Sequence, residues 1–420
     1  MKNKLLKLAS FIPAVCMLLT GCGGAAGTNN LSTESVDGTT QSGGDVNLTV
    51  WCAEEDAALM DQIISSFKSQ YSDTNFTISV SGVAESECKT TLLSDVNQGP
   101  DVFTFADDQL ATLAAAGVLK PIEESEDIIS RNTEASVAAA TLGDDLYAYP
   151  LTADNGYFLY YNKKYLSDSD VETLDGILNV AASNGKKFSM DWNSGYYLYA
   201  FYGNTGLQVG LNDDGISNYC TWNSTDGSIT GIDVAQAMMD ISSNSGFVNG
   251  GDSVLTEGAA DDSVIAGVSG VWSAVALKEA WGDNLGAVKL PTYTCNGQQV
   301  QMASYAGYKM VGVNSYSSNK DWAAKLADWI SNEQNQTLRF NMREQGPSNS
   351  KAAASGEVAS SVALSAVYQQ AEFSSLQRIG AAYWDASARL GQAMATQNTG
   401  ALPLQDFLDS IVKEITASNS

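Results

Sequence analysis

The stretch that decides the fold is Val46-Asn47-Leu48-Thr49-Val50-Trp51. Its apolar residues alternate with polar ones, which is the pattern of a strand with one face buried. Acidic residues follow at positions 54–56, where negative charge favours the first turn of a helix. Apolar residues then recur at helical spacing between Met60 and Tyr71. The stretch therefore predicts a strand followed directly by a helix with one buried face.

The same alternation continues downstream. Residues 76–80 alternate as a second strand, residues 87–97 have a helical pattern, and Gly99-Pro100 interrupts the chain before a third strand at 101–105. A further helix is expected over 108–116. Strands that alternate with helices predict a parallel α/β sheet. Because ligands lie beyond the carboxyl ends of such strands, residues 51–55 and 105–109 are expected beside one cleft.

The rest of the chain predicts a second lobe. Residues 146–162 are expected to form two strands joined by a crossing segment, since Pro150 and Gly156 interrupt an apolar run. A chain of 420 residues exceeds what one hydrophobic core usually organises. Further helices are predicted at 234–241, 322–330, 376–394 and 404–415.

The N-terminal segment has the pattern of an export signal. Three lysines precede an apolar run from Leu8 to Leu19. Leu19-Thr20-Gly21-Cys22 resembles a bacterial lipobox, which implies cleavage before Cys22 and acylation of that cysteine. Residues 1–21 are therefore expected to be a signal peptide, and 22–45 a lipidated N-terminus with a flexible tether rich in Gly, Ser, Thr and Asn.

Composition excludes several classes of function. The 22 basic and 48 acidic residues give a net charge of −26, which argues against nucleic-acid binding. Histidine is absent, which excludes Ser-His-Asp and Cys-His catalysis and His-ligated metals. The four cysteines of the expected folded region could form up to two disulfides, although buried free thiols are favoured and zinc spacing is missing. These are Cys52, Cys88, Cys220 and Cys295.

Aromatic and acidic residues together suggest a carbohydrate site. Flat aromatic faces cover the C–H faces of sugar rings, while carboxylates and amides accept and donate hydrogen bonds to hydroxyls. Tyr196-Tyr197, Trp272, Tyr305 and Tyr383-Trp384 are the aromatic candidates, with core packing as the alternative for each. The adjacent Glu54-Glu55 pair cannot flank one glycosidic bond from opposite sides, which argues against a glycosidase.

Six landmarks in order resemble the sugar-binding proteins of ABC importers. The first are Gly99-Pro100-Asp101-Val102-Phe103 with Phe105-Ala106-Asp107-Asp108-Gln109-Leu110, and Leu159-Tyr160-Tyr161-Asn162-Lys163. The later ones include Ser269-Gly270-Val271-Trp272, Gln345-Gly346-Pro347-Ser348 and Tyr383-Trp384. Within that family the chain is similar to the maltodextrin-binding lipoproteins of Gram-positive bacteria.

The resemblance implies a set of sugar-contacting residues. Asp108 stands at the family's hydroxyl-binding aspartate, Gln109 replaces an arginine and Phe105 replaces a tryptophan. Glu55 falls at an acid that contacts sugar, and the crossing-segment carboxylate falls at Asp154 or Asn155 because the register differs by one residue. Tyr196, Trp272 and Trp384 match the family's second-lobe stacking aromatics, and the clustering of aromatic residues adds Tyr197 and Tyr305 as candidates.

The resemblance implies a type II, two-lobe α/β binding protein with the ligand between the lobes and three hinge crossings. The expected first lobe comprises 46–152 and 305–346, and the second 153–304 and 347–420. The expected function is capture of linear oligosaccharides, foremost maltodextrins, for an ABC permease, without enzymatic activity, metal or cofactor. A monomer anchored by lipid at the extracellular face of the cytoplasmic membrane is expected. The alternatives are a xylo- or galacto-oligosaccharide, and a surface glycoside hydrolase.

Overall fold

The computed structural model describes residues 45–417 except 213 and 215. The predicted signal peptide, Cys22 and all but the last residue of the predicted tether lie outside these residues. In the part of the chain that the structure describes, no helix is long and apolar enough to cross a membrane.

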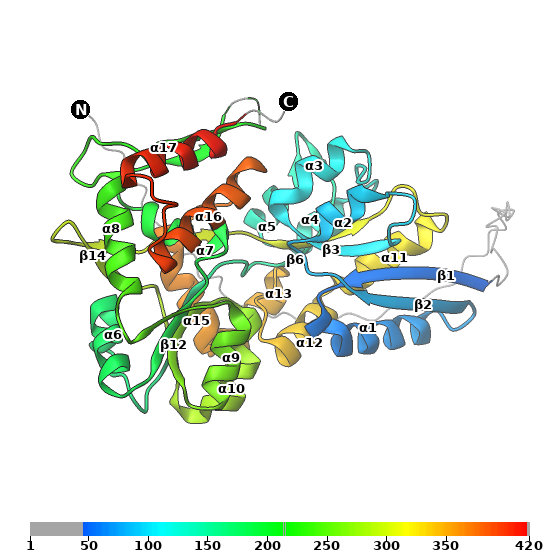
Figure 1. The fold of residues 1–420 in the computed structure, drawn as a ribbon. Helices are drawn as coiled ribbons and strands as arrows, with labels where there is room; N and C mark the ends of the chain where they lie inside the picture. Colours follow the sequence, from blue (N-terminus) through cyan, green and yellow to red (C-terminus); the bar gives the residue numbers. More distant parts are fainter. Residues whose placement is uncertain (1–44, 213, 215, 418–420) are drawn as a thin grey trace, which may run out of the picture. The chain divides into compact units, whose positions relative to one another are not determined.

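The first of two five-stranded sheets is built mainly from the N-terminal third of the chain (Figure 1). Its strands, in spatial order, are β2 (Asn75–Gly82), β1 (Asp45–Cys52), β3 (Val102–Ala106), β17 (Lys309–Val313) and β6 (Tyr149–Thr152). In β1, buried and exposed residues alternate as the sequence predicts.

This sheet is mixed rather than fully parallel. β1 runs parallel to β2 and β3, but β17 is antiparallel to both β3 and β6. The difference arises because β17 returns from the distant half of the chain, so no βαβ crossover sets its direction.

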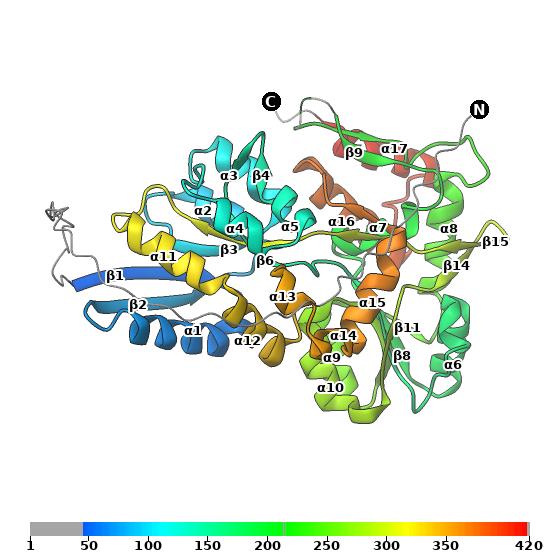
Figure 2. The ribbon, with the colours of Figure 1, turned by 180° about the vertical axis from the view of Figure 1, so that it is seen from behind.

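Short helices cover this sheet, and together they form the first lobe. α1, α11 and α12 contact one another, whereas α2 contacts α3 and β3, and α5 contacts β6 (Figures 1 and 2). The elements are η1 (Glu54–Asp56), α1 (Ala57–Gln70), α2 (Cys88–Ser94), η2 (Asp107–Gln109), α3 (Leu110–Ala115), α4 (Glu126–Arg131), α5 (Glu134–Ala139), β4 (Thr141–Leu142), β5 (Asp145–Leu146), α11 (Lys320–Ile330) and α12 (Glu333–Arg343).

The second sheet lies at the centre of the second lobe. Its strands, in spatial order, are β11 (Phe247–Asn249), β8 (Lys187–Met190), β12 (Val264–Ser269), β7 (Phe158–Asn162) and β13 (Leu285–Val288). β7 is buried along its whole length because both of its faces are covered. Leu159 and Tyr161 pack into one core, whereas Phe158 and Tyr160 pack into another.

Helices and small strand pairs surround the second sheet. The helices are η3 (Asp170–Glu172), α6 (Leu174–Ser183), α7 (Gly195–Tyr202), α8 (Gly231–Ser242), α9 (Asp252–Ala260), η4 (Val271–Ser273), α10 (Ala274–Trp281), η5 (Gly282–Asn284), α13 (Ser350–Ala353), α14 (Gly356–Ala359), α15 (Val362–Gln370), η6 (Ala371–Phe373), α16 (Ala382–Thr396) and α17 (Leu404–Ile415). The pairs are β9 (Val209–Leu211) with β10 (Asn218–Cys220), β14 (Thr292–Cys295) with β15 (Gln298–Gln301), and β16 (Ser304–Ala306) with β18 (Ser374–Leu376).

The predicted two-lobe α/β architecture is confirmed. The residue boundaries proposed for the lobes stay a prediction. One predicted helix begins too early: residues 374–376 form β18, and α16 starts only at Ala382. The reason is non-local, because β18 pairs in parallel with β16, some 70 residues earlier in the chain.

Candidate binding site

Three chain segments connect the two sheets and lie side by side. The first is 153–157, between β6 and β7, the second surrounds β16, and the third follows α12. The Ala153 N–H donates to the Gly346 carbonyl at 2.9 Å, and the Asn155 N–H donates to the Gly307 carbonyl at 3.2 Å. The first segment is therefore bonded to both of the others. These three segments are the crossings between the two lobes.

Asp154 and Asn155 occupy different environments in the first segment. The carboxylate of Asp154 is buried and accepts a hydrogen bond from the Gly346 N–H, and its burial raises its pKa. Asn155 is half-buried, and its main-chain carbonyl accepts a hydrogen bond from the Tyr196 hydroxyl at 3.3 Å. Asp154 thus joins two crossings, whereas Asn155 faces the aromatic residues.

An aromatic cluster forms beside Asn155 at the start of α7 and η4. The Tyr196 ring lies 4.8 Å from Tyr157 and 6.5 Å from Trp272, measured between centroids. Tyr196 and Trp272 are half-buried, while Tyr157 and Tyr197 belong to the core. The half-buried rings are the ones able to stack on a ligand.

Asp252 holds this cluster in place. Its carboxylate lies at the start of α9, accepts a hydrogen bond from the Trp272 indole N–H at 2.8 Å, and accepts another from the Tyr197 hydroxyl at 3.2 Å. Gly270 leaves the space that the indole occupies, since a Cβ there would lie only 2.1 Å from the ring. The indole N–H of Trp272 is therefore held by the Asp252 carboxylate, and its ring packs against the backbone of Gly270.

The first lobe brings a buried ion pair to the same indole. Lys309 Nζ lies 3.4 Å from Glu85 Oε2 and 5.7 Å from the Trp272 ring centroid, a cation–π geometry. Burial alone would lower the pKa of Lys309, but the carboxylates of Glu85, Asp56 and Asp154 raise it overall. The lysine therefore stays charged, and it links the lobes at this point.

Two adjacent carboxylates lie on η2 at the end of β3. Asp107 accepts hydrogen bonds from the Tyr308 N–H at 2.9 Å and from Arg378 Nη1 at 3.0 Å. Asp108 is half-buried, and burial together with the neighbouring Asp107 raises its pKa to about 7. Both carboxylates contribute to a raised pKa of Tyr196, as does burial, which is the larger cause. The negative charges of the first lobe therefore disfavour ionisation of the Tyr196 hydroxyl.

Of three first-lobe residues that the resemblance assigns to the sugar, two are buried and one is exposed. Gln109 is buried and uses its amide to donate to the Glu85 carbonyl at 2.6 Å and to accept from the Lys89 N–H at 2.9 Å. Phe105 lies entirely in the first-lobe core. Glu55 is exposed on η1. Gln109 and Phe105 therefore stabilise the first lobe from inside it, whereas the exposed Glu55 side chain is free to contact a ligand.

Tyr305 and Trp384 lie at a further edge of the aromatic cluster. Tyr305 is buried and stacks on Tyr199, with ring centroids 4.2 Å apart and an interplanar angle of 15°. Trp384 is half-buried and packs edge-on against Tyr383 at 5.1 Å. Trp384 is therefore the more accessible of the two predicted residues.

Sequence reasoning did not find the charged residues that support this site. They are Glu85, Asp107, Asp252, Lys309 and Arg378. Arg378 and Asp107 are separated by 271 positions, so no local pattern could pair them. The one usable signal is the Asp107-Asp108 pair at the end of a predicted strand.

Among the described residues, no group of three or more Cys, Asp or Glu side chains could hold a metal ion. The four cysteines in this part of the chain are free thiols. Burial raises the pKa of Cys52, Cys88 and Cys220 to about 12, so these thiols stay protonated and unreactive.

Comparison with known proteins assigns a family. Residues 62–366 match the family model described as bacterial extracellular solute-binding protein. The chain is 29% identical over 297 residues to the galactooligosaccharide-binding protein of Bacillus subtilis (strain 168), which covers 66% of each chain. It is 24% identical over 339 residues to the maltooligosaccharide ABC transporter solute-binding lipoprotein of Streptococcus pneumoniae serotype 4, which covers 77% of each chain.

Solved structures agree with the fold. A structure solved with acarbose has a TM-score of 0.79 and 28% identity, and the match covers 89% of this chain and 99% of that one. A maltodextrin-binding protein from L. casei BL23, solved without ligand, has a TM-score of 0.71 at 24% identity, covers 89% and 99% of the two chains, and supports the fold alone.

Proposed function

Because the chain belongs to the bacterial extracellular solute-binding proteins, we propose that it captures a linear oligosaccharide between its lobes and delivers it to an ABC permease. Family membership assigns binding rather than catalysis, in agreement with the predicted lack of enzymatic activity. The observation that carries the proposal is the half-buried pair Tyr196 and Trp272, with the Lys309 ammonium of the first lobe lying 5.7 Å from the Trp272 ring centroid.

The chemistry of this cluster suits a neutral sugar. Aromatic rings offer faces for C–H groups, and Asp108 and Asn155 offer acceptors and donors for hydroxyls. Asp107 is already paired with Arg378, and Lys309 with Glu85, so neither charge needs a ligand of opposite sign. We propose Glu55, Asp108, Asn155, Tyr196, Trp272 and Trp384 as contacting residues, and Phe105, Gln109, Asp154, Tyr197 and Tyr305 as residues that position them.

Maltodextrins are the first candidate ligand and galacto-oligosaccharides the second. A relative named for each class supports the respective candidate. Calorimetric titration with maltotriose, galactotriose, xylotriose and a tripeptide tests the proposal. We expect heat from maltotriose and little from xylotriose. Heat from galactotriose alone would move the assignment to the second candidate, and heat from the tripeptide alone would contradict sugar binding altogether.

The transport mechanism we propose is hinge closure. Only ligand contacts that differ between the open and closed forms can shift that equilibrium. The bonded crossing segments at Ala153, Asn155, Gly307 and Gly346 would be the hinge.

We also propose attachment to the outer face of the cytoplasmic membrane through acylated Cys22. Labelling cells with radioactive palmitate tests this attachment. The wild-type protein should take up label, whereas a Cys22→Ser variant should not and should appear in the medium. Sedimentation of the acyl-free protein would test the predicted monomer.

A further inference from the structure

A hollow lies on the second lobe, next to the aromatic cluster. Its volume is about 420 Å³, and its walls come from α7, from the β9–β10 hairpin and from the segment after β18. The residues that matter here are Tyr199, Tyr219, Tyr305, Ser375 and Arg378. Three tyrosines and an arginine therefore line one hollow, so it offers aromatic rings and hydrogen-bond donors to a ligand.

A row of aromatic rings connects this hollow with the candidate site. Tyr305 lines the hollow and stacks on Tyr199, with ring centroids 4.2 Å apart, and its ring also lies 6.1 Å from that of Tyr196 at an angle of 28°. Tyr196 in turn neighbours Trp272. The hollow and the candidate site are therefore joined by neighbouring aromatic side chains of the second lobe.

Tyr219 gives the rim of the hollow an exposed aromatic surface. Its side chain is on β10, directly opposite Gly210 on β9, and the residue is 42% exposed. A Cβ at position 210 would lie 2.6 Å from the Tyr219 hydroxyl oxygen, so the missing side chain is what lets the tyrosine lie against the hairpin. Leu376, which is 52% exposed, lines the same hollow. Exposed apolar residues gathered around a hollow often mark a binding site.

Arg378 supplies unused donors at the junction of the hollow and the candidate site. Its hydrogen bonds to described residues, to the Asp107 carboxylate at 3.0 Å and the Gln377 carbonyl at 3.2 Å, both come from Nη1. A guanidinium has five N–H donors, so Nε and Nη2 remain for a ligand. Because Asp107 already balances the charge of Arg378, the group can donate to neutral hydroxyls without requiring an anion.

We propose that this hollow is an extension of the binding site, which holds the sugar units of a longer oligosaccharide beyond those at Trp272 and Tyr196. Tyr219 stacks on one unit, and Arg378 donates hydrogen bonds to hydroxyls near the junction. The inference rests on the proposed function and adds to it a preference for longer chains. The exposed position of Tyr219 leaves the far end of the ligand open to solvent.

Calorimetry with maltotriose and maltoheptaose tests the extension, or with galactotriose and galactopentaose where only that series binds. The wild-type protein should bind the longer sugar roughly five- to tenfold more tightly, the range expected from one additional aromatic contact with hydrogen bonds. In a Tyr219→Ala variant the ratio of the two affinities should fall to near one. A Gly210→Val variant should lose the same ratio, because the added side chain displaces the Tyr219 ring.

The control is Tyr316→Ala, which removes a tyrosine that is 49% exposed on the first lobe. It should keep the wild-type ratio, and circular dichroism should show that all variants fold. A wild-type protein without length preference overturns the extension, as does a Tyr219→Ala variant that keeps the full ratio. Failure of every oligosaccharide to bind the wild-type protein would instead contradict the proposed function.

Discussion

The pKa of Asp108 changes on folding. Its carboxyl loses a proton near pH 4 in an unfolded chain, whereas burial and Asp107 raise its pKa to about 7 in the folded protein. Between these values the folded protein holds a proton that the unfolded chain has released. Stability therefore falls as the pH rises from about 4 to about 7, and the penalty is constant above that range.

We predict that Asp108→Asn removes this fall. Relative to the variant, the wild-type protein should lose about 1–3 kcal/mol of unfolding free energy between pH 4.5 and 7.5, since one unit of pKa corresponds to about 1.4 kcal/mol. Urea unfolding at a series of pH values measures the difference. Asp144→Asn, at an exposed aspartate of the same lobe, is the control and should follow the wild-type curve. Parallel curves for the wild-type protein and Asp108→Asn would show that Asp108 does not titrate in this range.

Two substitutions of Trp272 distinguish its stacking on the ligand from its hydrogen bond to Asp252. We predict that Trp272→Ala weakens binding of the preferred trisaccharide at least about tenfold, because it removes the aromatic face that the proposed site uses. Trp272→Phe should weaken binding less, since it keeps a ring and loses only the hydrogen bond to Asp252. Equal affinities for wild type and Trp272→Ala in calorimetry would exclude the indole from the site.

For individual residues, the sequence predicts which residue types form the candidate site better than it predicts the role of each one. The resemblance assigns Gln109 and Phe105 to the sugar, but their side chains are buried among first-lobe residues. Conversely, Arg378 and Asp252 have no local signal, because their partners become neighbours only on folding. Burial and long-range pairing are properties of the folded chain, and one sequence does not contain them in readable form.

Among the helices and strands, local sequence patterns predict those elements whose formation depends on neighbouring residues. The predicted strand at 46–51 lies within β1, and the predicted helix at 404–415 has the bounds of α17. The predictions are wrong where pairing with a distant segment of the chain determines the secondary structure or the strand direction. β18 exists only because β16 lies beside it, and β17 runs antiparallel because it returns from the other lobe.

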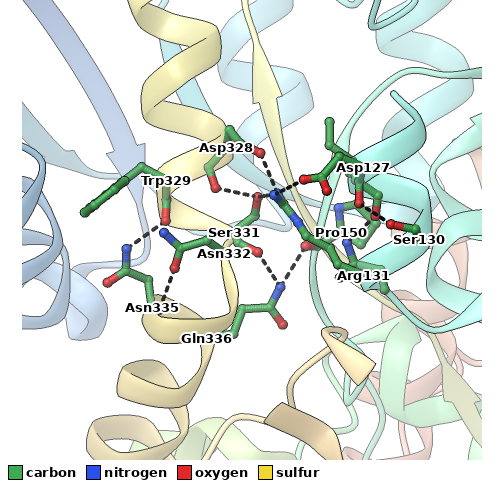
Figure 3. A network of polar contacts seen from close by, with 12 residues as sticks. Asp127, Ser130, Arg131, Pro150, Asp328, Trp329, Ser331, Asn332, Asn335 and Gln336 are labelled. Carbon is green, nitrogen blue, oxygen red and sulfur yellow. Dashed lines mark hydrogen bonds and ion pairs between the residues drawn. The ribbon is translucent and has the colours of Figure 1, made fainter. Parts of the chain in front are cut away.

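Gln336 shows how one side chain joins elements around the hinge. It lies on α12 and is buried, and its amide donates to the carbonyls of Ser331 at 2.7 Å and Pro150 at 3.2 Å (Figure 3). Its own oxygen accepts a hydrogen bond from the Asn349 N–H at 2.8 Å. Pro150 precedes the first crossing, and Asn349 follows the third. Gln336 therefore connects the chain just before the first crossing with the chain just after the third. Arg131 joins α4 to α11 in the same network through Asp328 at 2.5 Å.

We predict that Gln336→Leu lowers the unfolding free energy by about 2–4 kcal/mol, because it leaves three buried polar groups without a partner. Urea unfolding monitored by tryptophan fluorescence measures the loss. Gln334→Leu is the matched control, since Gln334 is an exposed glutamine on the same helix, and it should change stability by less than about 0.5 kcal/mol. Similar stabilities for the two variants would mean that the network around Gln336 contributes little.

At the scale of the whole molecule, the proposed function requires that one ligand contact both lobes. The proposed site takes Asp108 from the first lobe and Trp272 from the second, and the first-lobe Lys309 ammonium lies 5.7 Å from the indole ring centroid. The crossing segments are bonded to one another, so closure can occur about them without breaking either sheet. A ligand held by both lobes should therefore stabilise both.

We predict that saturating trisaccharide slows hydrogen exchange in peptides from both lobes, including those around Asp108 and around Trp272. Where exchange requires global unfolding, a free-sugar concentration of 100 times Kd should add about 2.7 kcal/mol of protection. The Trp272→Ala variant at the same sugar concentration should show less protection in both lobes, because a weaker grip on one side lowers occupancy of the whole site. Protection confined to one lobe would contradict closure, and it would reduce the site to a surface of that lobe, even if calorimetry still detects binding.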